Sequence, residues 1–119
     1  MKGETFNFEF FDKKIKLKIF RTGLFSKILG LMLRSSGTRN LLFEFKKETL
    51  IPIHSLFVFF PFLIIWFDSR NKVLDFKIVR PFTSLVKPKT EFRKFIEVPF
   101  NDENKEIIDF FVGKLERFK

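Results

Sequence analysis

Hydrophobic and polar side chains alternate along the first twenty residues of the chain. The period of two is typical of β-strands, and it continues on both sides of the dipeptide Asp12-Lys13. The pattern predicts a β-hairpin with one apolar and one charged face. Pairing Phe10 with Ile15 would place Glu9 opposite Lys16, so that opposite charges lie across the strands. The apolar face comprises Phe6, Phe8, Phe10, Ile15, Leu17 and Ile19.

The next segment, TGLFSKILGLMLRSSG, has the period of a helix. Leu24, Ile28 and Leu31 recur at a spacing that places them on one helical face, and Gly37 is suited to end the element. We expect an amphipathic helix over residues 23–34 that packs its apolar stripe on a sheet. A helix that lies on a membrane surface is the alternative that this pattern leaves open.

The longest run without a charge, LIPIHSLFVFFPFLIIWF, has eighteen residues. That length is near the lower limit of the ~17–25 residues that a membrane-spanning helix needs. Pro52 and Pro61 each lack an amide hydrogen, and His54 would bring a polar ring into the hydrocarbon. The β-branched and aromatic composition favours strands. We therefore expect two strands, 51–59 and 62–68, that supply the core, and no membrane span.

Shorter patterns complete the expected elements. Acidic residues open the segment NDENKEIIDFF, where the helix dipole favours them, and Gly113 is expected to end that helix. The whole chain, residues 1–119, is expected to form one mainly β (α+β) domain: a small β-sandwich or partly closed barrel of about six to eight short strands with one or two short helices. The remaining expected elements are strands at 40–46, 73–79, 92–99 and 115–118, a loop at 80–90, and a helix at 101–111.

Composition excludes several kinds of chemistry. The 119 residues include no cysteine, which rules out disulfides, thiolate metal sites and a cysteine nucleophile. One histidine and no tyrosine leave few groups for acid–base catalysis near neutral pH. No spacing of zinc ligands and no phosphate-binding glycine loop is present. We expect no metal and no cofactor, and we favour a function without catalysis.

The beginning of the chain has no pattern of a secretory signal. Glu4, Glu9 and Asp12 interrupt any apolar stretch in MKGETFNFEFFD. We therefore expect a cytoplasmic protein. The sequence leaves its oligomeric state open.

An ordered set of short motifs resembles one protein family. Along residues 20–118, the motifs occur in the same order as in the prokaryotic family called domain of unknown function 192, which the chain resembles. The resemblance implies a compact, soluble, mainly β domain. It supplies no established reaction, cofactor or substrate. The chain departs from the family pattern at Val58, Leu63 and Lys114, where the family usually has methionine, an acid and an acid. If the acid after Pro-Ile acts in chemistry elsewhere in the family, this chain lacks it. The motifs are GLMLR (30–34), LLFEF (41–45), IHSLFVFFPFLIIWFD (53–68), RPF (80–82), Pro88 and IEVP (96–99).

Three polar residues lie within apolar segments and form the candidate ligand pocket. Arg34, His54 and Glu97 occupy such positions, and all three fall on matching positions of the family patterns. A buried polar group needs a partner, and a cluster of them is a place where a ligand can replace one. The competing hypothesis is a closed structural network in which Arg34 or Arg80 neutralises Glu97. The sequence leaves both hypotheses open.

The net charge of +9 and the isoelectric point near 10 suit a polyanionic partner such as nucleic acid. A solvated surface that reflects lysine-rich composition would look the same in sequence. We favour a small non-enzymatic binding or interaction module; a basic nucleic-acid-associated protein is the alternative, and an enzyme with a His54/Glu97 pocket is a third hypothesis. The candidate polyanion contacts are Lys13, Lys14, Lys16, Lys18, Arg93 and Lys94.

Overall fold

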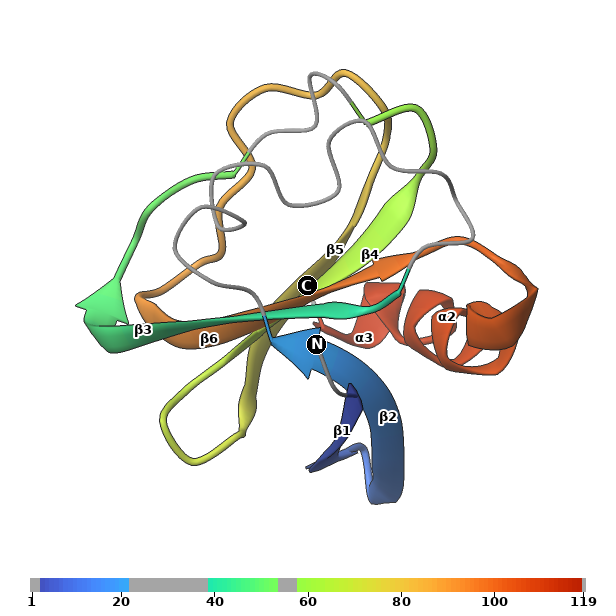
Figure 1. Ribbon diagram of the computed structural model, residues 1–119, viewed down its shortest axis with the longest axis horizontal. Coiled ribbons are helices and arrows are strands. Elements are labelled where there is room, and N and C mark those ends of the chain that lie inside the picture. The colour runs from blue at the N-terminus through green and yellow to red at the C-terminus, as the bar shows by residue number, and fades with distance from the viewer. Residues whose placement is uncertain (1–2, 22–38, 54–57, 119) are drawn as a thin grey trace.

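The computed structural model describes residues 3–21, 39–53 and 58–118. In this part of the chain, six strands form one sheet in the order β1-β2-β3-β6-β4-β5, which curls into a half-barrel (Figure 1). Strands β2 and β3 pair in parallel, and the other neighbours pair antiparallel. The predicted mainly β class with a partly closed barrel is confirmed. The strands are β1 (Gly3–Phe10), β2 (Lys13–Arg21), β3 (Leu41–Thr49), β4 (Phe62–Phe67), β5 (Val73–Val79) and β6 (Phe92–Pro99).

The N-terminal hairpin has the predicted faces but another register. Phe8 lies opposite Ile15, and Glu9 lies opposite Lys14 rather than Lys16. The predicted pairing was wrong by two residues because the turn consists of Phe11 and Asp12 alone. Both have positive φ values, 49° and 62°, as a two-residue type I′ turn requires. A shift of two residues keeps every side chain on its face, so the alternation could not detect it.

Only the second half of the apolar run forms a strand in the described residues. Strand β4 is buried along its whole length, with β5 and β6 on either side. The predicted strand 51–59 was wrong where the structure describes it: Ile53 makes one isolated bridge to Val86, and the other described residues there lie outside strands. Among the described helices, none is long and apolar enough to cross a membrane.

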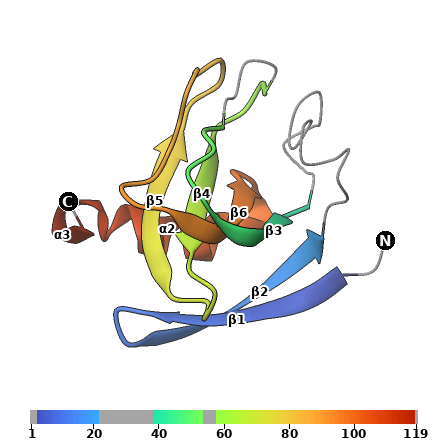
Figure 2. The same ribbon diagram turned by 90° about the vertical axis from the view of Figure 1, so that its left-hand side faces the viewer.

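The sheet has a hydrophobic core on each face. The first core contains Leu63, Ile65, Ile96 and Val98, and both the β1–β2 hairpin and the C-terminal helix pack on it (Figure 2). The second core lies on the opposite face, where the loops before β4 and after β5 contribute Val58, Phe60 and Val86. Strands covered on both faces have continuous apolar sequences, which explains FLIIWF in β4. The other main residues of the second core are Phe43, Ile64, Trp66, Phe92 and Phe95.

The C-terminal segment is helical apart from a turn at Gly113 and Lys114, and its longest helix ends before Gly113 as predicted. The segment comprises η1 (Asp102–Asn104), α2 (Lys105–Val112) and α3 (Leu115–Phe118). The predicted helix is confirmed, whereas the predicted strand at 115–118 was wrong. Gly113 has φ −65°, a right-handed helical value, so the backbone keeps turning as a helix instead of extending. The predicted helix at 23–34 lies outside the described residues.

Candidate functional site

One of the three residues of the predicted pocket belongs to the described part of the chain. Glu97 lies on β6 between Leu41 of β3 and Ile64 of β4, and it is only 5% exposed. Its place in the strand directs it to the second core. Arg34 and His54 lie outside the described residues. The convergence of these three side chains therefore stays a prediction.

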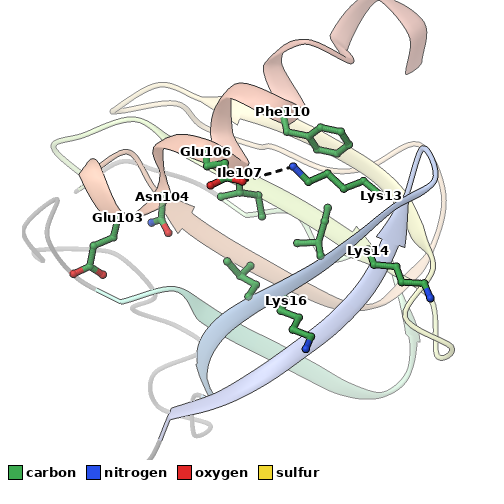
Figure 3. Close-up of a pocket in the computed structure, with 10 residues that line it drawn as sticks. Lys13, Lys14, Lys16, Glu103, Asn104, Glu106, Ile107 and Phe110 are labelled. Carbon is green, nitrogen blue, oxygen red and sulfur yellow. Dashed lines mark ion pairs between the residues drawn. The ribbon is translucent and has the colours of Figure 1, made fainter.

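The lysines of β2 occupy two positions relative to the C-terminal helix. Lys13 extends toward α2, where its Nζ lies 3.8 Å from Glu106 Oε1 and 4.9 Å from the centre of the Phe110 ring (Figure 3). Lys14 and Lys16 point away from α2 in the same view. Together with Lys18 they alternate with buried residues of β2, so all three share the exposed face of the hairpin.

Arg21, at the end of β2, is neutralised within the fold. Its Nε donates to Glu4 Oε2 at 2.7 Å, and its Nη1 donates to Glu44 Oε1 at 2.5 Å. Burial lowers the pKa of Arg21, but the hydrogen bonds and charges of Glu44 and Glu4 outweigh that effect and raise the pKa above its ordinary value. The guanidinium thus links β2 to β1 and β3 through its two hydrogen bonds.

Arg93 and Lys94, which were predicted as polyanion contacts, make bonds to strand β3 and to the β4–β5 turn. Arg93 Nε donates to the carbonyl oxygen of Phe45 at 2.6 Å. Lys94 Nζ donates to Asn71 Oδ1 at 2.5 Å, and its side chain is 13% exposed. The lysines of β2 are more accessible than these two residues. The role of all six predicted contacts stays a prediction.

A groove follows the line between β2 and the η1–α2 segment, and we call it the β2–α2 groove. It consists of two adjoining cavities of about 250 Å³ and about 480 Å³. The smaller cavity is lined by Lys13, Ile15, Glu106, Ile107 and Phe110, among others (Figure 3). The larger is lined by Lys18, Phe20, Arg39 and Asn40. Both cavities share Lys16, Leu17, Glu103 and Asn104.

A pair of buried asparagines forms the inner wall of the larger cavity. Asn104 Nδ2 donates to Asn40 Oδ1 at 2.9 Å and to the carbonyl oxygen of Pro99 at 2.8 Å. Asn40 Nδ2 donates in turn to the carbonyl oxygen of Lys18 at 2.9 Å. These bonds hold the end of β2, the start of β3, the end of β6 and the start of α2 at fixed positions around the cavity.

Cations gather around an aromatic ring in the larger cavity. The guanidinium carbon of Arg39 lies 4.3 Å from the centre of the Phe20 ring, and Lys18 Nζ lies 5.9 Å from it. Lys16, although its side chain points away from α2, also lines the cavity, so three cations line it against one acid, Glu103. The cavity is therefore suited to an anion that carries an apolar part.

Sequence patterns identified the lysines of this groove but not its other polar residues. Arg39 lies alone among neutral residues in GTRNLL, and the two asparagines are ordinary residues at the ends of elements. Their proximity depends on the parallel contact of β2 with β3 at Phe20 and Leu41. Within the described residues, no group of three or more histidine, cysteine or acidic side chains could hold a metal ion.

Comparisons with known proteins show similarity of fold. No family model and no curated protein matches the chain. A candidate transcription regulator from Sinorhizobium meliloti 1021 has a similar structure, with 13% identity, a TM-score of 0.68 and coverage of 80% of this chain and 77% of that one. A protein of unknown function from Novosphingobium aromaticivorans DSM 12444 has 12% identity, a TM-score of 0.70 and coverage of 87% and 77%. The resemblance to domain of unknown function 192 stays a prediction.

Proposed function

We propose that this protein is a non-enzymatic binding module that holds an anionic ligand in the β2–α2 groove. The observation that carries the proposal is the set of cations, Lys16, Lys18 and Arg39, around the cavity of about 480 Å³. Lysine and arginine form charge-assisted hydrogen bonds with carboxylates and phosphates, and these bonds are stronger than neutral ones. The bonded asparagines Asn40 and Asn104 hold the wall behind the cations in place.

The residues of the groove support binding rather than catalysis. Its titratable side chains are lysines, Arg39 and two acids, Glu103 and Glu106, which are exposed to water. No serine, histidine or cysteine is among the residues that line its two cavities. Nucleophilic catalysis by a hydroxyl, thiol or imidazole requires such a group next to a base, and the side chains of the groove supply none of the three. The enzyme hypothesis thus rests on the separate pocket predicted from His54 and Glu97.

Nucleic acid is the second candidate for the ligand. Lys14, Lys16 and Lys18 form a row on one face of β2, where successive side chains on a face are about 6.8 Å apart. A row of cations suits the row of phosphates along a nucleic-acid strand. The name of the Sinorhizobium protein agrees with this hypothesis, although a shared fold does not carry function with it.

Charge reversal at Lys16 tests the proposal, because this residue lines both cavities. The matched control is Lys47→Glu, which changes an exposed lysine on β3 that lines neither cavity. The probes are pyrophosphate, measured by titration calorimetry, and a single-stranded oligonucleotide, measured by fluorescence anisotropy. We expect Lys16→Glu to weaken binding about tenfold or more, which corresponds to the loss of one charge-assisted bond. Lys47→Glu should change it less than about twofold, because salt screens distant charges.

The salt dependence distinguishes the two ligand classes. Binding of the oligonucleotide that falls steeply with salt, with a slope of about 0.7 per phosphate contacted, would support nucleic acid. Binding of pyrophosphate with a shallow slope would support a small anion. Equal losses in the two variants would show that net charge alone attracts the probes, and the groove would then not be the site. Failure of both probes to bind the native protein would also reject the proposal.

A further inference from the structure

Large apolar side chains are exposed on two neighbouring loops, far from the groove. They belong to residues 50–53 and 58–61, between β3 and β4, and to the loop between β5 and β6, which lie at the end of the sheet opposite the β1–β2 hairpin (Figure 2). Backbone hydrogen bonds between Ile53 and Val86 join the loops, and the rings of Phe59 and Phe82 pack edge-to-face at 5.3 Å. We define the loop patch as Leu50, Ile51, Phe59, Phe82 and Leu85.

The exposure of this patch is high for such residues. Leu85 is 75% exposed, Phe59 61% and Phe82 57%. Isolated apolar residues on a surface are ordinary, but a group of adjacent ones marks a surface that contacts another molecule. The loop patch is therefore a candidate docking surface.

Backbone strain holds two of these side chains in place. Phe82 has φ 60° and Leu85 has φ 54°, which lie in the left-handed region. For residues other than glycine, asparagine and aspartate this conformation costs about 1–2 kcal/mol each. The positive φ of Leu85 does not bring its side chain into the core, because most of that side chain is exposed to water. Both residues lie at bends that shape the loop: Phe82 follows Pro81 in a turn, and Leu85 directly precedes buried Val86, which pairs with Ile53.

The charged residues that adjoin Leu85 are positive, whereas the exposed acid Glu48 lies two positions before Leu50. A cavity of about 340 Å³ adjoins Leu85 and is lined by Lys77 and Arg80 as its charged residues. Lys87 is exposed on the same loop, and its carbonyl oxygen accepts a hydrogen bond from Lys77 Nζ at 2.7 Å. The segment RPFTSLVKPKT contains three cations and no acid, and the run LIPIHSLFVFFPF contains no charge.

We propose that the loop patch docks on an anionic phospholipid surface. Phe59, Phe82 and Leu85 enter the boundary between headgroups and acyl chains, while Lys77 and Arg80 lie beside the headgroup phosphates. Aromatic and aliphatic side chains next to cations are the combination that binds proteins to anionic membrane surfaces. The contact is peripheral, involves no membrane span, and is independent of the ligand in the β2–α2 groove.

The charge of the patch favours lipid over a second copy of this chain. Two copies, each with a net charge of +9, would bring the cations of both patches together, and like charges disfavour such a contact. An anionic bilayer has the complementary charge. The exposed side chains also lie on two loops at one end of the sheet, a place from which they can enter a soft surface together.

Asparagine substitutions separate a role in docking from a role in folding. Leu85→Asn and Phe82→Asn remove the apolar side chains, and asparagine adopts positive φ more readily than leucine or phenylalanine does. We expect the thermal midpoint of each variant to stay unchanged or to rise. Co-sedimentation with vesicles of phosphatidylglycerol and phosphatidylcholine should fall about tenfold or more for each, the amount expected from one lost Leu or Phe insertion.

Phe11→Asn is the matched control. Phe11 also combines an exposed apolar side chain with positive φ, 49°, but it lies in the hairpin turn at the other end of the molecule. Its substitution should leave vesicle binding unchanged. Vesicles of phosphatidylcholine alone should bind the native protein at least about tenfold more weakly than the anionic vesicles, because they offer the cations no complementary charge.

Several results would overturn the proposal. Native binding of Leu85→Asn and Phe82→Asn to anionic vesicles would remove the patch from the contact. Equal binding to neutral and anionic vesicles would contradict the part assigned to Lys77 and Arg80. Self-association in the absence of lipid that both variants abolish would identify a second copy as the occupant. Absence of vesicle binding by the native protein would reject a lipid surface outright.

Discussion

At the scale of single residues, two buried asparagines connect segments that are distant in sequence. Asn104 is 6% exposed and satisfies two acceptors, one on Asn40 and one on the backbone of Pro99. A buried acceptor without a donor costs more than the net gain from an ordinary hydrogen bond. These bonds therefore matter for stability as well as for the shape of the groove.

Replacing the donor tests this role. Asn104→Leu should lower the free energy of unfolding by about 1–3 kcal/mol, since it leaves two buried acceptors without their hydrogen bonds. Urea titration followed by tryptophan fluorescence measures the change, because Trp66 is fully buried. Asn7→Leu, at an exposed position of β1, is the control and should be nearly neutral. Equal stability of both variants would show that the buried bonds are dispensable.

Glu97 distinguishes the two hypotheses for the predicted pocket. In a structural network, Glu97→Gln leaves a cationic partner without its counter-charge and lowers the free energy of unfolding by about 1–3 kcal/mol. This is the result that we expect, because the carboxylate is buried within the sheet. The exposed acid Glu91 provides the control Glu91→Gln. Unchanged stability of Glu97→Gln would instead favour a site held for a ligand.

At the scale of elements, the β1–β2 hairpin is attached to the sheet through its apolar face. The ring of Phe8 lies 5.0 Å from that of Phe67 on β4 and 6.3 Å from that of Phe111 on α2, measured between centres. Phe10 stacks on Phe111 at 5.1 Å. The hairpin and α2 thus share one core, and the groove between them depends on this packing.

Two substitutions on opposite faces of the hairpin test this arrangement. Phe8→Asp would place an unpaired charge in the first core and should lower the free energy of unfolding by about 3 kcal/mol or more, or cause aggregation. Lys16→Glu should change stability by less than about 0.5 kcal/mol, since Lys16 is exposed. Differential scanning fluorimetry compares the two. Similar thermal shifts would contradict the assigned faces.

At the scale of the whole molecule, the most apolar segment is in the middle of the protein. β4 lies between β5 and β6, and its alternate residues contribute to the cores on both faces. Its apolar surface is therefore removed from water by the rest of the chain.

Because β4 is buried, we expect the protein to stay in solution without detergent. The purified protein should stay in the supernatant after high-speed centrifugation in detergent-free buffer, because β4 needs no lipid to cover it. Any binding to membranes through the loop patch should be weakened by high salt, which screens its charges but leaves its apolar contacts in place. Partitioning into the membrane fraction that resists both high salt and alkali would contradict this prediction.

Local patterns in the sequence were sufficient to predict most strands and to assign the two faces of the hairpin. The alternation of side chains reports which residues share a face, and β5 and β6 have the bounds that the pattern predicts. The lysines of β2 could be identified for the same reason. The periodicity of a strand depends on neighbouring residues alone, so it can be recognised without knowing how distant parts of the chain pack.

The helical form of residues 115–118 and the β2–α2 groove were decided by the tertiary structure, whereas the alternation of side chains left the register of the hairpin open. A turn of two residues set the register, although another turn would have kept the same faces. The groove unites β2, Arg39, Asn40 and the segment around Asn104, which come together because β2 pairs with β3 and the hairpin shares a core with α2. No local pattern contains that information, because these contacts join residues that are distant in sequence, such as Phe20 with Leu41 and Asn40 with Asn104.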